Sequence, residues 1–244
     1  MQLSALILVC LLAPFLAAGE PVPIIACCGD SITSGTGTAA NAPTAPTPNL
    51  VKPGETNPGG AWPNQLSILL NKNGTPAEVR NFGIGGATVT SYLSDSEHKK
   101  YRQAALDSKP QHVVIMLGTN DSRDSGVKTI YHDRMVLLIK QFAALSSPPT
   151  IWICTPPPIF SVRGGGLSPV DANLNAEILP TLLKLAKDPA LSLHLIDVHA
   201  AFVGKKELFP DLLHPGQEGA ALLAKTVFTA IAPALTKPAK AKAK

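Results

Sequence analysis

The sequence predicts an α/β fold, a three-layer α/β/α sandwich built on a mainly parallel sheet of five strands. Two observations carry this prediction. Short runs rich in β-branched residues alternate along the chain with amphipathic, helix-like stretches. In addition, several of the strand-like runs read as continuous apolar stretches, which is typical of strands that helices cover on both faces.

The five strand candidates each end in a turn rich in Gly, Pro, Asn or Asp. Because ligands of such sheets bind beyond the carboxyl ends of the strands, functional residues are expected where each apolar run gives way to polar residues. The candidates are VPIIACC (22–28), AEVRNF (77–82), HVVIML (112–117), TIWIC (150–154) and LSLHLIDV (191–198).

Apolar residues recur at helical spacing between these strands. The stretch WPNQLSILL (62–70) carries Pro63 near its start, as helices often do. Two further helices are predicted by the series Tyr131, Met135, Leu138, Phe142 and Leu145 and by the series Leu223, Val227 and Ile231.

The segment from Thr36 to Trp62 has no periodicity and is dense in Pro, Gly, Thr and Asn. We interpret it as a long loop after the first strand. Loops of this length are functional lids or insertions, so this one is either a substrate rim beside Ser31 or a surface insertion.

The two ends of the chain differ from the middle. Residues 1–19 contain an apolar core that is too short to span a bilayer comfortably and is followed by small residues. They are predicted to be a secretory signal. Because no Lys or Arg precedes the core, an uncleaved anchor is the alternative. Residues 236–244 are predicted to be a disordered basic tail. Residues 20–235 then form one domain, which is expected to be secreted or to act in the secretory pathway or periplasm.

The formal net charge of +4 comes largely from the lysines of that tail, and no basic helix with interleaved aromatic residues is present. A nucleic-acid partner is therefore not expected. No second apolar run in the sequence reads as long enough to span a membrane, so no stable membrane association is expected after signal removal. The sequence makes no prediction of oligomeric state.

Three cysteines follow the signal segment, all in predicted strands. Adjacent Cys27 and Cys28 point to opposite faces of the sheet, so a bond between them would be strained. Buried thiols are the interpretation, with a Cys28–Cys154 bridge as the alternative.

Polar residues that could take part in catalysis follow the strands. GDSIT (29–33) places Ser31 in the first turn, NFGIGGATV (81–89) exposes glycine N–H groups after the second strand, and LGTND (117–121) presents the amide of Asn120 after the third. Near the C-terminus, LFPDLLHPGQEGA (208–220) places Asp211 three residues before His214. Each motif alone is equally consistent with a structural turn or cap.

Together these residues supply what ester hydrolysis requires. A serine hydroxyl attacks an ester when a base takes its proton, and an imidazole does this best when a carboxylate orients it. Asp211 and His214 can fill these roles for Ser31. The oxyanion then needs donors, for which the Ser31 N–H, a glycine N–H and the Asn120 amide are available.

From residue 22 to about residue 235, the chain resembles the SGNH, or GDSL-type, hydrolases. The resemblance identifies Ser31 of GDSIT as the nucleophile, Gly86 of NFGIGG and Asn120 of GTND as oxyanion-hole donors, and Asp211 and His214 of DLLH as the rest of the triad. It implies the flavodoxin-like strand order 2-1-3-4-5 and a cofactor-independent ester hydrolase with no metal. The chain departs from the family pattern in its Thr36–Trp62 insertion and at Gly85, where relatives often carry Ser.

Within this family, the segments VVIMLGTNDS, ICTPPP and LFPDLLHP look most like carbohydrate O-acetylesterases, including the sialate O-acetylesterase-like enzymes. The expected substrate is a small-molecule or glycan ester. The alternatives are a lipid or acyl-thioester hydrolase of the same fold and a secreted carbohydrate-binding module without catalytic activity.

Three competing interpretations concern individual residues. His199, two residues after Asp197, is a second candidate base. Asp30, Asn120, Asp121 and His214 resemble the ligands of metallophosphoesterases, but too few ligands accompany them for a metal site. Asn73 and Asn120 both lie in N-glycosylation sequons, and only Asn73 is compatible with an Asn120 that lines an oxyanion hole.

Overall fold

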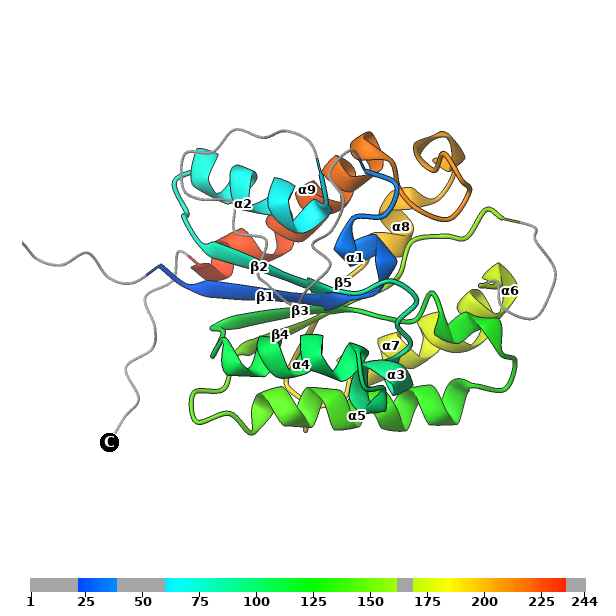
Figure 1. The fold of residues 1–244 in the computed structure, drawn as a ribbon, viewed down its shortest axis with the longest axis horizontal. Coiled ribbons are helices and arrows are strands. Elements are labelled where there is room, and N and C mark those ends of the chain that lie inside the picture. Colours follow the sequence, from blue (N-terminus) through cyan, green and yellow to red (C-terminus); the bar gives the residue numbers. More distant parts are fainter. Residues whose placement is uncertain (1–21, 39–59, 162–168, 236–244) are drawn as a thin grey trace, which may run out of the picture.

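A parallel sheet of five strands runs through the middle of the computed structural model, which describes residues 22–38, 60–161 and 169–235 (Figure 1). The strand order is β2-β1-β3-β4-β5, and every neighbouring pair is parallel. Both the sheet and its order confirm the expectation. The strands are β1 (Ile24–Gly29), β2 (Glu78–Gly83), β3 (His112–Met116), β4 (Thr150–Cys154) and β5 (Leu193–Ile196).

Helices cover both faces of this sheet and complete the predicted three layers (Figure 1). One face, the upper one in Figure 1, packs against α2 (Trp62–Lys72), α8 (Val198–Phe202) and α9 (Gln217–Leu235). The other packs against α3 (Val89–Ser94), α4 (His98–Asp107), α5 (Lys128–Ala143) and α7 (Leu179–Ala186). Short helical segments are α1 (Ser31–Ser34), η1 (Asp121–Arg123), α6 (Asp171–Asn173), η2 (Leu174–Ile178) and η3 (Lys206–Leu208).

The cysteines follow the alternation of side chains along a strand. Cys27 and Cys154 lie in the core beneath α2 and α9, whereas Cys28 lies in the core beneath α4 and α5. All three are buried free thiols, as expected. The alternative Cys28–Cys154 bridge was wrong, because the sheet separates the two sulfur atoms.

The apolar series form the predicted helices with small differences at their ends. Pro63 occupies the first turn of α2. The α5 series is buried as far as Phe142, whereas Leu145 lies beyond the last helical residue and is only partly buried. Helix α9 is longer than the sequence series indicated, at 19 residues, and is long and apolar enough to cross a membrane by length and composition alone. The expectation that no second apolar run reaches this length was therefore wrong. In this fold, its face of Leu223, Val227 and Ile231 is fully buried against the core.

The register of the sheet brings the carboxyl ends of its strands together. Gly29 at the end of β1 lies opposite Gly83 on β2 and Met116 on β3, and Cys154 on β4 lies opposite Ile196 on β5. The motifs that follow these strands therefore meet along one edge.

Several predictions fall outside the described residues. These are the signal segment 1–19, residues 39–59 of the Thr36–Trp62 loop and the tail 236–244. They stay predictions, as does the secreted location that rests on the first of them.

Candidate active site

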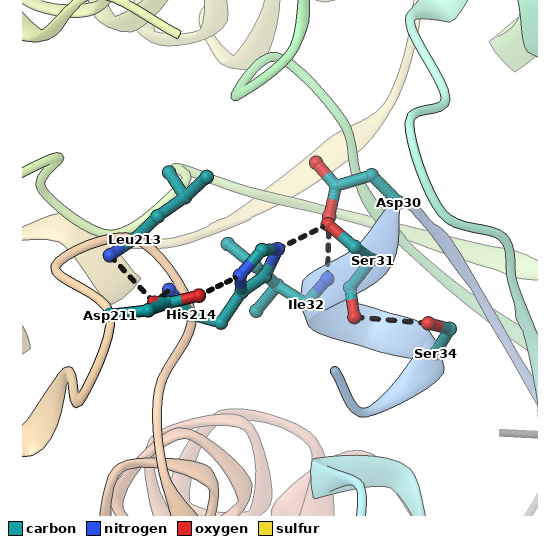
Figure 2. A network of polar contacts seen from close by, with 7 residues as sticks. All are labelled: Asp30, Ser31, Ile32, Ser34, Asp211, Leu213 and His214. Carbon is teal, nitrogen blue, oxygen red and sulfur yellow. Dashed lines mark hydrogen bonds and ion pairs between the residues drawn. The ribbon is translucent and has the colours of Figure 1, made fainter. Parts of the chain in front are cut away.

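Ser31 is the first residue of α1 and lies two residues after the last residue of β1. The preceding residue, Asp30, caps this helix, because its Oδ1 accepts a hydrogen bond of 2.9 Å from the backbone N–H of Ile32. At the other end of the same turn, the Ser34 hydroxyl donates to the Ser31 carbonyl at 3.0 Å. Both contacts, drawn in Figure 2, fix the backbone that carries the Ser31 side chain.

His214 and Asp211 reach Ser31 from a loop that precedes α9. The Ser31 Oγ lies 2.9 Å from His214 Nε2, and His214 Nδ1 lies 2.6 Å from Asp211 Oδ2 (Figure 2). The other carboxylate oxygen of Asp211 accepts hydrogen bonds from the backbone N–H groups of Leu213, at 3.0 Å, and His214, at 2.6 Å. The structure therefore joins the three side chains into one continuous chain of hydrogen bonds.

The charge of Asp211 decides which nitrogen of His214 carries the proton. Partial burial raises the pKa of Asp211, but the hydrogen bonds from the His214 ring and from the two backbone N–H groups outweigh it and lower the pKa below the ordinary value. An ionised carboxylate can only accept, so His214 Nδ1 must donate to it. In the neutral imidazole, Nε2 is then left as an acceptor that faces the Ser31 hydroxyl.

The carboxyl end of β2 packs directly against α1, the helix that begins at Ser31. A Cβ atom at Gly83 would collide with the backbone N of Ser34, so only glycine permits this approach. The buried Asn81 side chain holds the same contact, since its Nδ2 donates to Thr33 O at 2.8 Å and its Oδ1 accepts from Gly83 N at 2.9 Å. Asn81 had no predicted role, although an amide inside a buried strand is a recognisable signal.

Of the two other predicted oxyanion-hole residues, Asn120 is hydrogen-bonded to the residue that follows Gly86. Gly86 is exposed and has φ of +76°, a backbone conformation that favours glycine. Asn120 is buried, with 4% of its surface exposed, and its Nδ2 donates to the carbonyl of Ala87, next to Gly86, at 3.0 Å. The structure thus brings the turn after β2 and the turn after β3 into direct contact.

The competing base, His199, has other partners. Its Nδ1 lies 3.0 Å from the Pro156 carbonyl, and its backbone N–H donates to Thr155 Oγ1 at 2.9 Å. Asp197 caps α8 through the N–H of Ala200 and accepts from the Thr155 hydroxyl. Asp197 therefore anchors the turn after β5 and is not paired with His199.

Asp30 and Asp121 are two buried carboxyl groups beside the predicted site residues. The sequence did not predict their burial. Burial raises the pKa of Asp30 to about 6. Burial also raises the pKa of Asp121 to about 7, with a further contribution from Asp30. The single N–H of Val89, at the start of α3, donates a bifurcated hydrogen bond to both oxygens of Asp121. Asp121 thus ties α3 to η1. Within the described residues, no group of three or more His, Cys, Asp or Glu side chains is arranged to hold a metal ion.

We expect the Asp121→Asn variant to gain stability relative to wild type as pH rises from 4 to 8. The folded protein holds the Asp121 proton more tightly than the unfolded chain does, so ionisation between pH 3.8 and about 7 destabilises the fold. At about 1.4 kcal/mol per pKa unit, the upper limit of the gain is about 4 kcal/mol. Urea unfolding of both proteins at each pH measures it.

The exposed Asp107, replaced by Asn, is the matched control for the same change of side chain at the surface. A stability difference between Asp121→Asn and wild type that does not change with pH would contradict the raised pKa of Asp121.

Residues 27–222 match the model of the GDSL-like Lipase/Acylhydrolase family. The chain belongs to this family. An acetylxylan esterase from Xylanibacter ruminicola is 28% identical over 232 residues, which cover 85% of this chain but only 42% of that enzyme. The chain therefore spans less than half the length of this relative.

Solved structures of the family share the fold. An acetylxylan esterase from Geobacillus stearothermophilus, Axe2, aligns with a TM-score of 0.62 and 21% identity over 86% of this chain and 94% of its own. A putative SGNH hydrolase from Slackia heliotrinireducens aligns with a TM-score of 0.59 and 21% identity, over 86% of this chain and 100% of its own. At this level of identity, the likeness shows the SGNH hydrolase fold alone.

Proposed function

We propose that this protein is a serine ester hydrolase that removes O-acetyl groups from acetylated carbohydrate through an acyl-enzyme on Ser31. The hydrogen-bonded chain from Ser31 Oγ through His214 to Asp211 carries the proposal. A serine, a neutral imidazole with its acceptor nitrogen toward that serine, and a carboxylate on the opposite ring nitrogen are the groups that acyl transfer by a serine requires.

The reaction proceeds in two halves. As Ser31 Oγ bonds to the ester carbonyl carbon, its proton passes to His214 Nε2, and the Asp211 carboxylate stabilises the imidazolium. The bond to the alcohol oxygen then breaks, and His214 protonates this oxygen. Water attacks the acyl-enzyme with His214 as base, so acetate leaves and Ser31 regains its proton.

The negative charge on the tetrahedral intermediate needs donors. We assign this role to the N–H groups of Ser31 and Gly86 and to the Asn120 amide. The Ser31 N–H lies in the first turn of α1, where backbone N–H groups have no intrahelical acceptor. The contact of Asn120 with Ala87 keeps its amide beside the turn of Gly86.

The relatives support the substrate class and the triad. The Xylanibacter and Geobacillus proteins are both acetylxylan esterases. Catalytic mutants of the Geobacillus enzyme replace a serine, an aspartate and a histidine by alanine, and its aspartate and histidine are three positions apart. Asp211 and His214 have the same spacing.

The test is the specificity constant of the protein on p-nitrophenyl acetate, butyrate and octanoate, followed by acetate release from acetylated xylo-oligosaccharides and O-acetylated sialic acid. We expect a steep preference for acetate and release from at least one acetylated sugar. A maximum at octanoate would instead indicate a lipid hydrolase, and hydrolysis of acyl-thioesters alone a thioesterase. Carbohydrate binding without any ester hydrolysis would refute the proposal that the protein is an enzyme.

A further inference from the structure

Arg123, at the end of η1, contacts the amide that we assign to the oxyanion hole. Its Nη2 donates to Asn120 Oδ1 at 2.6 Å, a charge-assisted hydrogen bond. The backbone of the same short helix supports this geometry, since Arg123 N donates to Asn120 O and Ser122 N donates to Gly118 O. Arg123 lies outside the motifs from which the site was predicted.

The two contacts of the Asn120 side chain fix its orientation. An asparagine amide can rotate by 180° and exchange its oxygen and nitrogen. A guanidinium has no acceptor, so only Oδ1 can face Arg123. A carbonyl has no hydrogen to donate, so only Nδ2 can face Ala87 O. Both partners therefore select the same orientation.

This orientation leaves the second N–H of the Asn120 amide available as a donor. The nitrogen of Asn120 carries two hydrogens, and the contact with Ala87 O uses one of them. No hydrogen bond among the described residues uses the second. A donor held in place before the reaction costs no reorganisation when negative charge develops, which is how an oxyanion hole lowers the barrier.

The positive charge of Arg123 has a second effect on the same amide. A short hydrogen bond from a cation draws electron density toward Asn120 Oδ1 and makes the opposite N–H a stronger donor, as in other polarised hydrogen-bond chains. Arg123 is half-buried, so water screens this effect less than at a fully exposed site.

We infer that Arg123 is a positioning residue for ester hydrolysis, which holds and polarises the Asn120 amide as an oxyanion donor. The inference rests on the proposed function. It predicts that loss of Arg123 weakens the binding of the transition state and leaves the binding of the substrate unchanged.

The test compares kcat and KM for acetate release by wild type, Arg123→Ala, Arg123→Lys, Asn120→Ala and the double variant Arg123→Ala/Asn120→Ala. We expect Arg123→Ala to lower kcat about 10- to 100-fold with KM unchanged, the scale of a misplaced catalytic group. Arg123→Lys keeps the charge without the planar fork and should recover part of the loss. Asn120→Ala should lose about 10²- to 10³-fold.

The double variant separates positioning from a structural role. If Arg123 acts through Asn120, its removal should cost less than about twofold once Asn120 is alanine. Additive losses would overturn the inference, as would a KM that rises while kcat holds. The Arg123→Lys variant keeps the test valid if Arg123→Ala does not fold, because a folded Arg123→Lys enzyme that retains wild-type kcat would also overturn it.

A matched control comes from α4, where Arg102 Nη1 makes the same kind of contact with an amide oxygen, Gln141 Oε1, at 2.8 Å. Arg102→Ala should leave kcat unchanged. If the wild type is active and the kcat of Arg123→Ala is unchanged, the inference is refuted and the proposed function stands. An inactive wild type would refute both.

Discussion

Replacement of Ser31 by alanine is expected to lower kcat for acetate release by roughly 10⁶-fold, the loss seen when a catalytic serine is removed from a triad. Without the hydroxyl, no acyl-enzyme forms, although the His214–Asp211 pair stays in place. The measurement is acetate release from an acetylated sugar, because aryl acetates hydrolyse spontaneously and hide small residual rates.

Two controls accompany the Ser31→Ala variant. Ser94→Ala makes the same change at an exposed position on α3 and should keep wild-type activity. Mass spectrometry of wild type quenched during turnover should find an acetyl group on Ser31. Activity of Ser31→Ala within about tenfold of wild type, far from the loss expected of a triad serine, would remove Ser31 from the mechanism.

The Asp211→Asn variant is expected to lower kcat by about 10⁴-fold, the effect known for the equivalent change in a serine protease triad, while the fold persists. The asparagine oxygen can keep both backbone hydrogen bonds from Leu213 and His214. Its NH₂ group then faces His214 Nδ1 and forces this nitrogen to accept. The proton moves to Nε2, where it points at Ser31 Oγ, so the histidine can no longer act as a base.

Asp197→Asn is the matched control for this prediction, because Asp197 also caps a turn near a histidine at the same edge of the sheet. It should change kcat little. A large loss in Asp197→Asn together with an active Asp211→Asn would transfer the role of base to His199. Thermal unfolding of both variants checks that they fold.

The sequence predicted those parts of the site that short segments determine. Ser31 follows its strand within one turn, and Asp211 and His214 share one turn, so local spacing was informative. The strand-like runs and their apolar periodicity likewise predicted the sheet and its covering helices, and the order of the strands came from the family resemblance.

The remaining features depend on contacts between distant segments. Asp121 accepts from Val89, 32 positions away, and Asn81 supports Thr33 across 48 positions. Neither the burial of Asp121 nor its raised pKa is visible in a local motif. The contact of Arg123 with Asn120 spans only three residues, but its importance depends on Ala87, which orients the amide from the other side.

The pairing of Ser31 with His214 also has a consequence for biosynthesis. These two residues are 183 positions apart, and His214 belongs to the loop that precedes the last helix of the fold. At about 5 to 20 residues per second, a ribosome makes the nucleophile on the order of ten seconds before its base. During that interval, the growing chain carries an unactivated serine, so esters in the cell meet no hydrolase until the C-terminal part of the domain has docked.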